Sequence, residues 1–144
     1  SFGILLITGS GGALGYIIRE SGIINSLSIN DVTGLASILS VFIIAAIIKT
    51  IQGSSTVAIV TTCAITAPLI QSIGMTSELE KVILIISIGS GAMTISHIND
   101  SYFWVVSKYS NIEMNDVIKF FSTTTLIQGL FGLLTSITLY IFLT

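Results

Sequence analysis

The chain has 144 residues, of which 52% are apolar and only 8% are charged. Soluble domains carry about 25% charged residues, so five basic and seven acidic side chains cannot cover a soluble surface of this size. The composition therefore excludes a soluble globular domain, and the net charge of −2 excludes the basic surface that nucleic acids bind. The single cysteine, Cys63, excludes an intrachain disulfide. We expect a protein that spans the lipid bilayer.

Residues 2–18 form the first apolar segment and predict a membrane-spanning helix. They include the glycine-rich sequence LLITGSGGALG, which resembles the strand–turn–helix opening of short-chain dehydrogenases, where glycines let the backbone approach a pyrophosphate. The Tyr-x-x-x-Lys pair of those enzymes is absent, and no alternation of strands with polar helices follows. We therefore interpret the glycines as positions of close helix packing, and we expect neither an enzyme nor a nucleotide cofactor.

Two further apolar segments, residues 35–51 and residues 57–73, are joined by a short turn without any charged residue. The two segments are either two full spans or the arms of a re-entrant hairpin over residues 35–73, whose tip stays inside the bilayer. Polar backbone is tolerated at that depth where it lines a cavity in the protein. Because no charge anchors the turn in water, we favour the hairpin.

The turn between these arms is the first candidate for a substrate site. Its residues are Gln52, Gly53, Ser54, Ser55 and Thr56. The free N–H groups at the start of the second arm carry partial positive charge, and transporters aim such half-helix ends at anionic substrates. A turn that only packs the two arms together is the alternative. Lys49, one helical turn earlier, either adds a positive charge to the site or extends its ammonium to the membrane interface.

Residues 82–106 are long enough to span the bilayer, but a polar cluster interrupts them. The cluster consists of Ser96, His97, Asn99 and Asp100. A carboxylate at this depth costs about 2.5–3.5 kcal/mol, so it needs a cavity or a partner. We expect a discontinuous helix, with Gly89 and Gly91 helping it to unwind, in which Asp100 and His97 form a protonatable site. The alternative is a hydrogen-bonded pair that only holds helices together. One histidine without a second pair of ligands predicts no metal site.

The remaining segments complete a helical membrane protein. Residues 74–81 form a loop with three charged side chains, residues 108–115 form a polar connection, and residues 117–143 form the last helix. The basic residues leave the orientation undecided, because two lie on each side of the membrane. The sequence therefore predicts an all-α, polytopic membrane protein with a re-entrant hairpin and a discontinuous transmembrane helix.

Three sequences in this order, LLITGSGGALG, QGSSTVA and SHINDSYFW, resemble the C-terminal part of the gluconate permease (GntP) family, within the ion transporter superfamily. The resemblance runs from about Leu5 to Leu143. It implies a proton-coupled importer of gluconate or a related sugar acid, with D-serine as the alternative substrate. It also implies an elevator-type fold of two inverted repeats, each of which contributes a hairpin tip and a broken helix to the site. Residues 1–144 would then be one repeat, in a multi-pass protein of the cytoplasmic (inner) membrane.

Carried over by position, the residues from Gln52 to Thr56 would form the second hairpin tip and bind substrate, together with Ser96 and Asn99. Asp100, assisted by His97, would couple the proton. The expected partners are a small organic anion, a proton, the lipid bilayer and the missing N-terminal repeat, whereas the oligomeric state, including a homo-oligomer, stays open. The chain starts at Ser1 without a basic leader, which predicts a piece of a longer permease. A non-transporting, truncated membrane module is the remaining alternative.

Overall fold

The computed structural model describes Gly9, Ala13 and residues 33–144. The span predicted over residues 2–18, with its glycine-rich sequence, otherwise lies outside the described residues. The elements beyond residue 33 are α3 (Leu35–Gln52), α4 (Ser55–Thr66), η2 (Ala67–Leu69), α5 (Glu78–Ala92), α6 (Ser101–Ser110), α7 (Met114–Asp116), η3 (Val117–Phe121) and α8 (Ser122–Leu143). No strand occurs in this described part, which confirms the all-α prediction for it.

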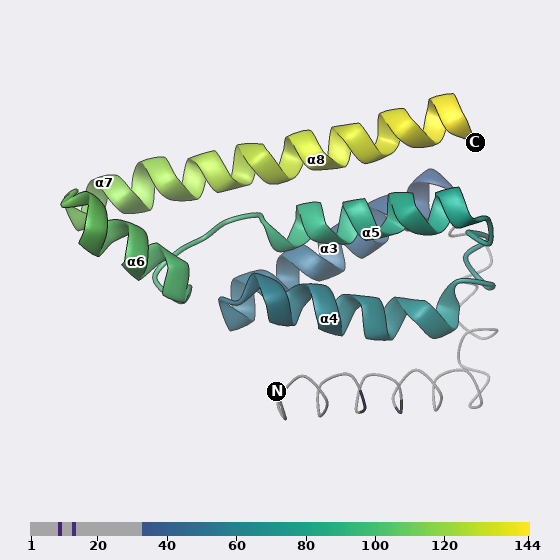
Figure 1. Cartoon of the computed structure of the whole chain (residues 1–144), viewed down its shortest axis with the longest axis horizontal. Helices are drawn as coiled ribbons and strands as arrows, with labels where there is room; N and C mark the ends of the chain where they lie inside the picture. Colours follow the sequence, from purple (N-terminus) through teal and green to yellow (C-terminus); the bar gives the residue numbers. More distant parts are fainter. Residues whose placement is uncertain (1–8, 10–12, 14–32) are drawn as a thin grey trace.

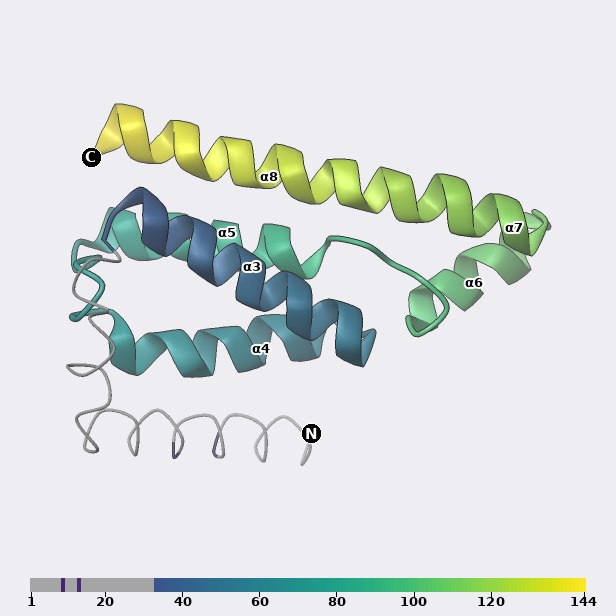
Figure 2. The same ribbon diagram turned by 180° about the vertical axis from the view of Figure 1, so that it is seen from behind.

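The long helices lie in layers. Figures 1 and 2 show α8 along one side of α5, α4 on the other side, and α3 crossing between them. α6 leaves this stack and packs against η3 at the start of the last helix. By length and composition, two of the described helices are suited to cross a membrane, Leu35–Gln52 and Met114–Leu143. At one end of the stack, α3 turns into α4 and α5 stops.

The turn between α3 and α4 is shorter than predicted. Gln52 ends α3, whereas Ser55 and Thr56 already belong to α4, so only Gly53 and Ser54 lie between the helices. Gly53 has a φ of 72°, and its N–H donates to the Lys49 carbonyl at 2.7 Å. A Cβ at Gly53 would collide with the Asn99 backbone carbonyl, so the turn needs glycine for both its conformation and its space.

α5 is bounded by two different kinds of helix end. Ser77 and Glu80 form a capping box at its start, where each side chain bonds the other residue's N–H. At its other end, α5 stops at Ala92, and residues 93–100 run without regular helix to the start of α6 (Figure 1). The polar cluster predicted to interrupt residues 82–106 lies in this segment, which we call the break.

The glycines of α5 do not cause the break. Gly89 and Gly91 both lie inside regular helix, which corrects the expectation that they help the chain to unwind. A Cβ at Gly91 would meet the Phe42 carbonyl and, at 2.9 Å, the Ala45 side chain, so this glycine lets α3 approach α5 closely. The helix ends at Ala92, and four residues later the N–H and the carbonyl of Ser96 bond hydroxyls of α8.

Small residues also bring α8 close to α5. A Cβ at Gly129 would lie 2.9 Å from the Ser90 carbonyl, and one at Gly132 would lie 2.8 Å from the Ser90 side chain. Such backbone approaches are the usual basis of helix packing in lipid, where no hydrophobic force drives helices together. The opposite faces carry large exposed apolar side chains, which on α3 recur every fourth residue: Leu35, Leu39, Ile43, Ile47 and Ile51.

Candidate functional site

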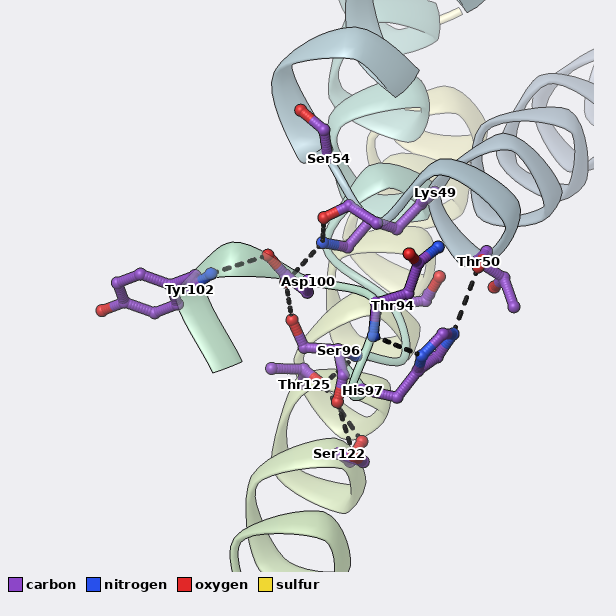
Figure 3. A network of polar contacts seen from close by, with 12 residues as sticks. Lys49, Thr50, Ser54, Thr94, Ser96, His97, Asp100, Tyr102, Ser122 and Thr125 are labelled. Carbon is purple, nitrogen blue, oxygen red and sulfur yellow. Dashed lines mark hydrogen bonds and ion pairs between the residues drawn. The ribbon is translucent and has the colours of Figure 1, made fainter. Parts of the chain in front are cut away.

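A buried ion pair joins α3 to the break. The Lys49 ammonium lies 2.6 Å from Oδ2 of Asp100, and the two side chains are only 2% and 9% exposed (Figure 3). The same ammonium donates to the Gly53 carbonyl at 3.3 Å, so it also contacts the turn between α3 and α4. Breaking such a pair by removing one partner leaves an uncompensated buried charge. Lys49 thus connects the two segments that the sequence predicted to form one site.

The carboxylate of Asp100 is held from three directions. Besides the Lys49 ammonium, its Oδ2 accepts a hydrogen bond from the Ser96 hydroxyl. Its Oδ1 accepts from the Tyr102 N–H at 2.9 Å, which makes Asp100 the N-cap of α6. One aspartate therefore begins the second half of the broken helix and pairs with the cation of α3 (Figure 3).

His97 and Asn99 reach across to the C-terminal end of α3. The Asn99 amide donates to the Ile51 carbonyl at 2.6 Å, and Nε2 of His97 lies 3.1 Å from the Thr50 carbonyl. Because a carbonyl only accepts, Nε2 carries the proton, and Nδ1 accepts from the Asn99 N–H at 3.2 Å. These bonds satisfy carbonyls that a helix end leaves without partners.

The side chains of His97 and Asp100 do not bond each other, and each contacts a group of α3 instead. The two residues are linked through the backbone, since the Asp100 N–H donates to the His97 carbonyl at 2.8 Å. Their spacing of three would align them on a helix, but the break is not helical at this point.

The last helix supplies the other side of the break. The Ser96 N–H donates to the Thr125 hydroxyl at 3.1 Å, and the Ser122 hydroxyl donates to the Ser96 carbonyl (Figure 3). The sequence reasoning missed both α8 residues, because hydroxyls in a threonine-rich first turn carry no charge that would single them out. Their signal was the excess of hydroxyls, three consecutive threonines, at the start of an otherwise apolar helix.

The remaining predicted site residues lie at the start of α4 and the end of α3. The Ser54 hydroxyl accepts from the Val57 N–H at 3.4 Å and so caps α4. The hydroxyls of Ser55 and Thr56 have no hydrogen-bond partner within residues 33–144, and Gln52 and Thr56 are exposed. The structure therefore brings the turn and the break together through Lys49 and Gly53, while several donors of the turn have no partner among residues 33–144.

The ion pair itself was within reach of the sequence. Lys49 is the only charge of its apolar segment, and Asp100 is the only one near the middle of residues 82–106. Two lone opposite charges in apolar segments must find each other or reach water. The alternative in which Lys49 extends its ammonium to the membrane interface is wrong, because the ammonium is buried against Asp100.

The described residues offer no site for a metal ion, since no three metal-ligating side chains of the His, Cys, Asp or Glu type gather there. A groove of about 320 Å³ runs between α3, the start of the break and α8. Its lining is apolar apart from two threonines: Phe42, Ile43, Ala46, Ile47, Thr50, Ile51, Thr94, Ile95, Leu126 and Leu130. This groove therefore has no charged side chain in its lining.

Comparison with known proteins identifies the family. Residues 2–142 match the GntP family permease. The chain is 36% identical over 131 residues to the high-affinity gluconate transporter of Escherichia coli K12 and 34% identical over 133 residues to the gluconate permease of Zymomonas mobilis. It is also 34% identical over 131 residues to the D-serine transporter DsdX of Escherichia coli O6:H1.

These alignments cover 90–92% of the chain but only 29% of each of the three relatives, so the chain spans less than a third of their length. No solved structure matches the chain. The matched relatives are transporters, and the described part of the chain is helical with two helices suited to a membrane. On the family match over nearly its whole length, this chain belongs to the GntP family of permeases.

Proposed function

We propose that the chain is the second repeat of a permease that carries gluconate, or a related small organic acid, together with protons across the cytoplasmic membrane. One observation carries the proposal: the buried Lys49–Asp100 pair joins the turn of a helical hairpin to the break in a second helix. Buried charges inside a membrane protein mark sites of transport because they are costly to keep there.

The substrate carboxylate would bind at the start of α4. There the free N–H groups and the hydroxyls of Ser55 and Thr56 have no protein partner in the described part of the chain, and Ser54 caps the helix. The substrate hydroxyls would bind to Ser96 and to the amide oxygen of Asn99, whose nitrogen is already used by the Ile51 carbonyl. Gln52 and Gly53 would complete the tip, with Gly53 giving the turn its close approach to the break.

Asp100 would carry the transported proton. It is the buried carboxylate nearest to both the tip and the break, and its partners are the Lys49 ammonium and two hydrogen-bond donors, the Ser96 hydroxyl and the Tyr102 N–H. His97 is the second titratable group of the break, and its ring bonds the Thr50 carbonyl. A proton on its Nδ1 would displace the Asn99 N–H, so its protonation would act on the end of α3.

The hairpin of α3 and α4 would be re-entrant. α4 and the η2 turn that continues it, Ser55–Leu69, together rise about 24 Å, less than the hydrocarbon core of about 30 Å. A tip at mid-membrane would expose polar backbone only to the protein site, as the bilayer requires. An inverted copy of the hairpin and the broken helix would lie elsewhere in a full permease, and the two units would move past a scaffold, in a multi-pass protein that could form a homo-oligomer.

Uptake into lipid vesicles tests the function. The full protein should accumulate radiolabelled gluconate when a proton gradient is imposed. Asp100→Asn should abolish this accumulation and leave exchange between labelled and unlabelled substrate intact. Glu78→Gln is the matched control, because it neutralises an exposed carboxylate at the other end of α5. If the Asp100→Asn protein still accumulates gluconate against its gradient, Asp100 is not the coupling residue.

A non-transporting membrane module is the second candidate, favoured by the bonds of His97 and Asn99 to the end of α3, which are structural contacts. Equilibrium binding of gluconate and of D-serine to the full protein separates the two. Saturable binding that is lost in Ser55→Ala, but kept in Ser110→Ala on an exposed face of α6, supports a transport site. Binding of neither ligand supports the module.

A further inference from the structure

We propose that Lys49 and Asp100 form a charge-exchange pair that sets how many protons enter with each kind of substrate. The Lys49 ammonium would release Asp100 and bind the substrate carboxylate instead. A monocarboxylate such as gluconate would then bring one proton onto Asp100, whereas a zwitterionic amino acid such as D-serine would bring none. This inference rests on the proposed function and makes it specific.

The surroundings of the ammonium suit such an exchange. An ammonium has three N–H donors, and within residues 33–144 only two acceptors contact it, Asp100 and the Gly53 carbonyl. Gly53 directly precedes Ser54, the N-cap of α4, so the ammonium lies beside the free donors of the tip. A carboxylate bound there has a cation that is 98% buried on one side and helix N–H groups on the other.

Charge balance then determines the proton. The empty pair is neutral, with one positive and one negative group in a buried site. A bound monocarboxylate adds one negative charge, and an unmatched buried charge costs several kcal/mol. One proton taken from water onto an oxygen of Asp100 removes that charge and leaves the ammonium to the substrate. No other bond forms or breaks, and the loaded site is neutral again.

A zwitterionic amino acid balances the same site without a proton. Its carboxylate takes the Lys49 ammonium, and its own ammonium takes the place of Lys49 beside Asp100. Two ion pairs replace one, and the site stays neutral throughout. Relatives of this chain are named for gluconate and for D-serine, and these two compounds carry a net charge of minus one and of zero at neutral pH.

Few titratable side chains lie near Asp100, so few groups besides the pair can take part in this exchange. The break itself contributes His97, whose Nε2 bonds the Thr50 carbonyl, and α3 contributes Lys49. α4 and α8 carry no ionisable acid or base near the pair and offer only hydroxyls. In the following segments, the Tyr102 side chain is exposed, and the Lys119 ammonium lies 5.6 Å from the Phe120 ring in η3.

Calorimetric binding to the full protein in lipid nanodiscs tests the proposal. Titration in two buffers with different ionisation enthalpies gives the protons taken up per ligand bound. We expect about one proton with gluconate and about zero with D-serine. The dissociation constant for gluconate should then rise about tenfold per pH unit across the range of uptake, while that for D-serine should not change.

Substitutions test whether the proton taken up with gluconate binds at the Lys49–Asp100 pair. Asp100→Asn should bind gluconate without proton uptake and bind D-serine at least tenfold more weakly, because the substrate ammonium loses its partner. Lys49→Arg keeps a cation and should keep both proton counts, which a purely structural role would not require. Glu78→Gln is the matched control and should change neither count.

The outcomes separate the exchange from the proposed function. Equal proton uptake with both ligands, or unchanged uptake in Asp100→Asn, overturns the exchange while leaving anion transport in place. The comparison of the two ligands on the unmodified protein decides this even if a variant does not fold. Absence of saturable binding of both ligands overturns the proposed substrate class, and the exchange with it.

Discussion

The two ends of α5 are stabilised in opposite ways. At its start, Ser77 and Glu80 satisfy each other's N–H groups, and Lys81 pairs with Glu78 at 2.7 Å in an exposed position. At its other end, the break depends on residues from two other helices, α3 and α8, and on a buried ion pair of nearly the same length, 2.6 Å. The first end is complete within five residues of sequence, 77–81, whereas the second exists only when the helices are assembled.

This difference separates a local helix end from a site. Exposed ion pairs contribute little, because water competes for both charges and salt screens them. A buried pair is costly to form, and breaking it is costlier still. The two ion pairs are nearly equal in length but unequal in energy. Substitutions at the two ends of α5 should therefore change the stability by different amounts.

The largest effect should come from Lys49→Met. Removal of the cation leaves Asp100 buried without its partner, and we expect a loss of about 3–5 kcal/mol in the free energy of unfolding. Thermal unfolding of the full protein in detergent measures it. In the double variant Lys49→Met/Asp100→Leu, which removes both charges, most of the lost stability should return. A double variant as unstable as the single one would show that packing, and not charge, is responsible.

The next effect should come from Gly53→Ala. Its φ of 72° is unfavourable for any L-residue, by about 1–2 kcal/mol, and its Cβ would also strike the Asn99 backbone. Gly74→Ala is the matched control, because Gly74 has a φ of 70° but its nearest neighbour is 3.6 Å away. Gly53→Ala should therefore lower the unfolding temperature more than Gly74→Ala does. If both variants lowered the unfolding temperature equally, the contact of the new Cβ with the Asn99 backbone would add no cost.

A smaller effect should follow from Asn99→Ala, which removes the donor to the Ile51 carbonyl. We expect a loss of about 1 kcal/mol, because the residue is exposed and water can replace the bond. Ser77→Ala at the start of α5 should cost a similar amount by removing a cap. The two differ in their location: hydrogen exchange should speed up at the end of α3 in the first and only at the start of α5 in the second.

The smallest effect should come from Lys81→Ala. The hydrogen bond from Lys81 holds the pKa of Glu78 below its ordinary value, so the pair stabilises the fold above that value and the contribution disappears as the pH falls. Both side chains are exposed, and we expect no measurable change in unfolding temperature at neutral pH and moderate salt. A change as large as that of Lys49→Met would erase the distinction between the two pairs.

The sequence predicted the helices better than the contacts between them. Apolar runs and caps are local, so α3 and the stop of α5 before the polar cluster follow from residue order alone. The partner of Asp100 lies 51 positions away, and only the matching of two lone charges, not any periodicity, points to it. Gly91 shows the same limit, because a glycine that permits close packing and a glycine that breaks a helix are identical in sequence.

The roles of hydroxyl residues were the least predictable part of the site. Ser122 and Thr125 bond the break only because α8 folds back along α5, which places its first turns beside Ser96. Hydroxyls in helices also bond their own preceding carbonyls, as Thr135 does, so the residue type alone assigns no partner. Electrostatic reasoning finds charges in apolar segments, but it does not find neutral partners.

The close helix contacts at Gly91, Gly129 and Gly132 fix the register of α3, α5 and α8 at once. A shift of α8 by four residues along α5 would put Leu133 into the space that Gly129 leaves against Ser90, which is too small for its side chain. α3, α5 and α8 therefore hold one another in register, and residues 93–100 are joined to the same assembly, because Thr94 lies against Gly129 and Asn99 lies against Gly53.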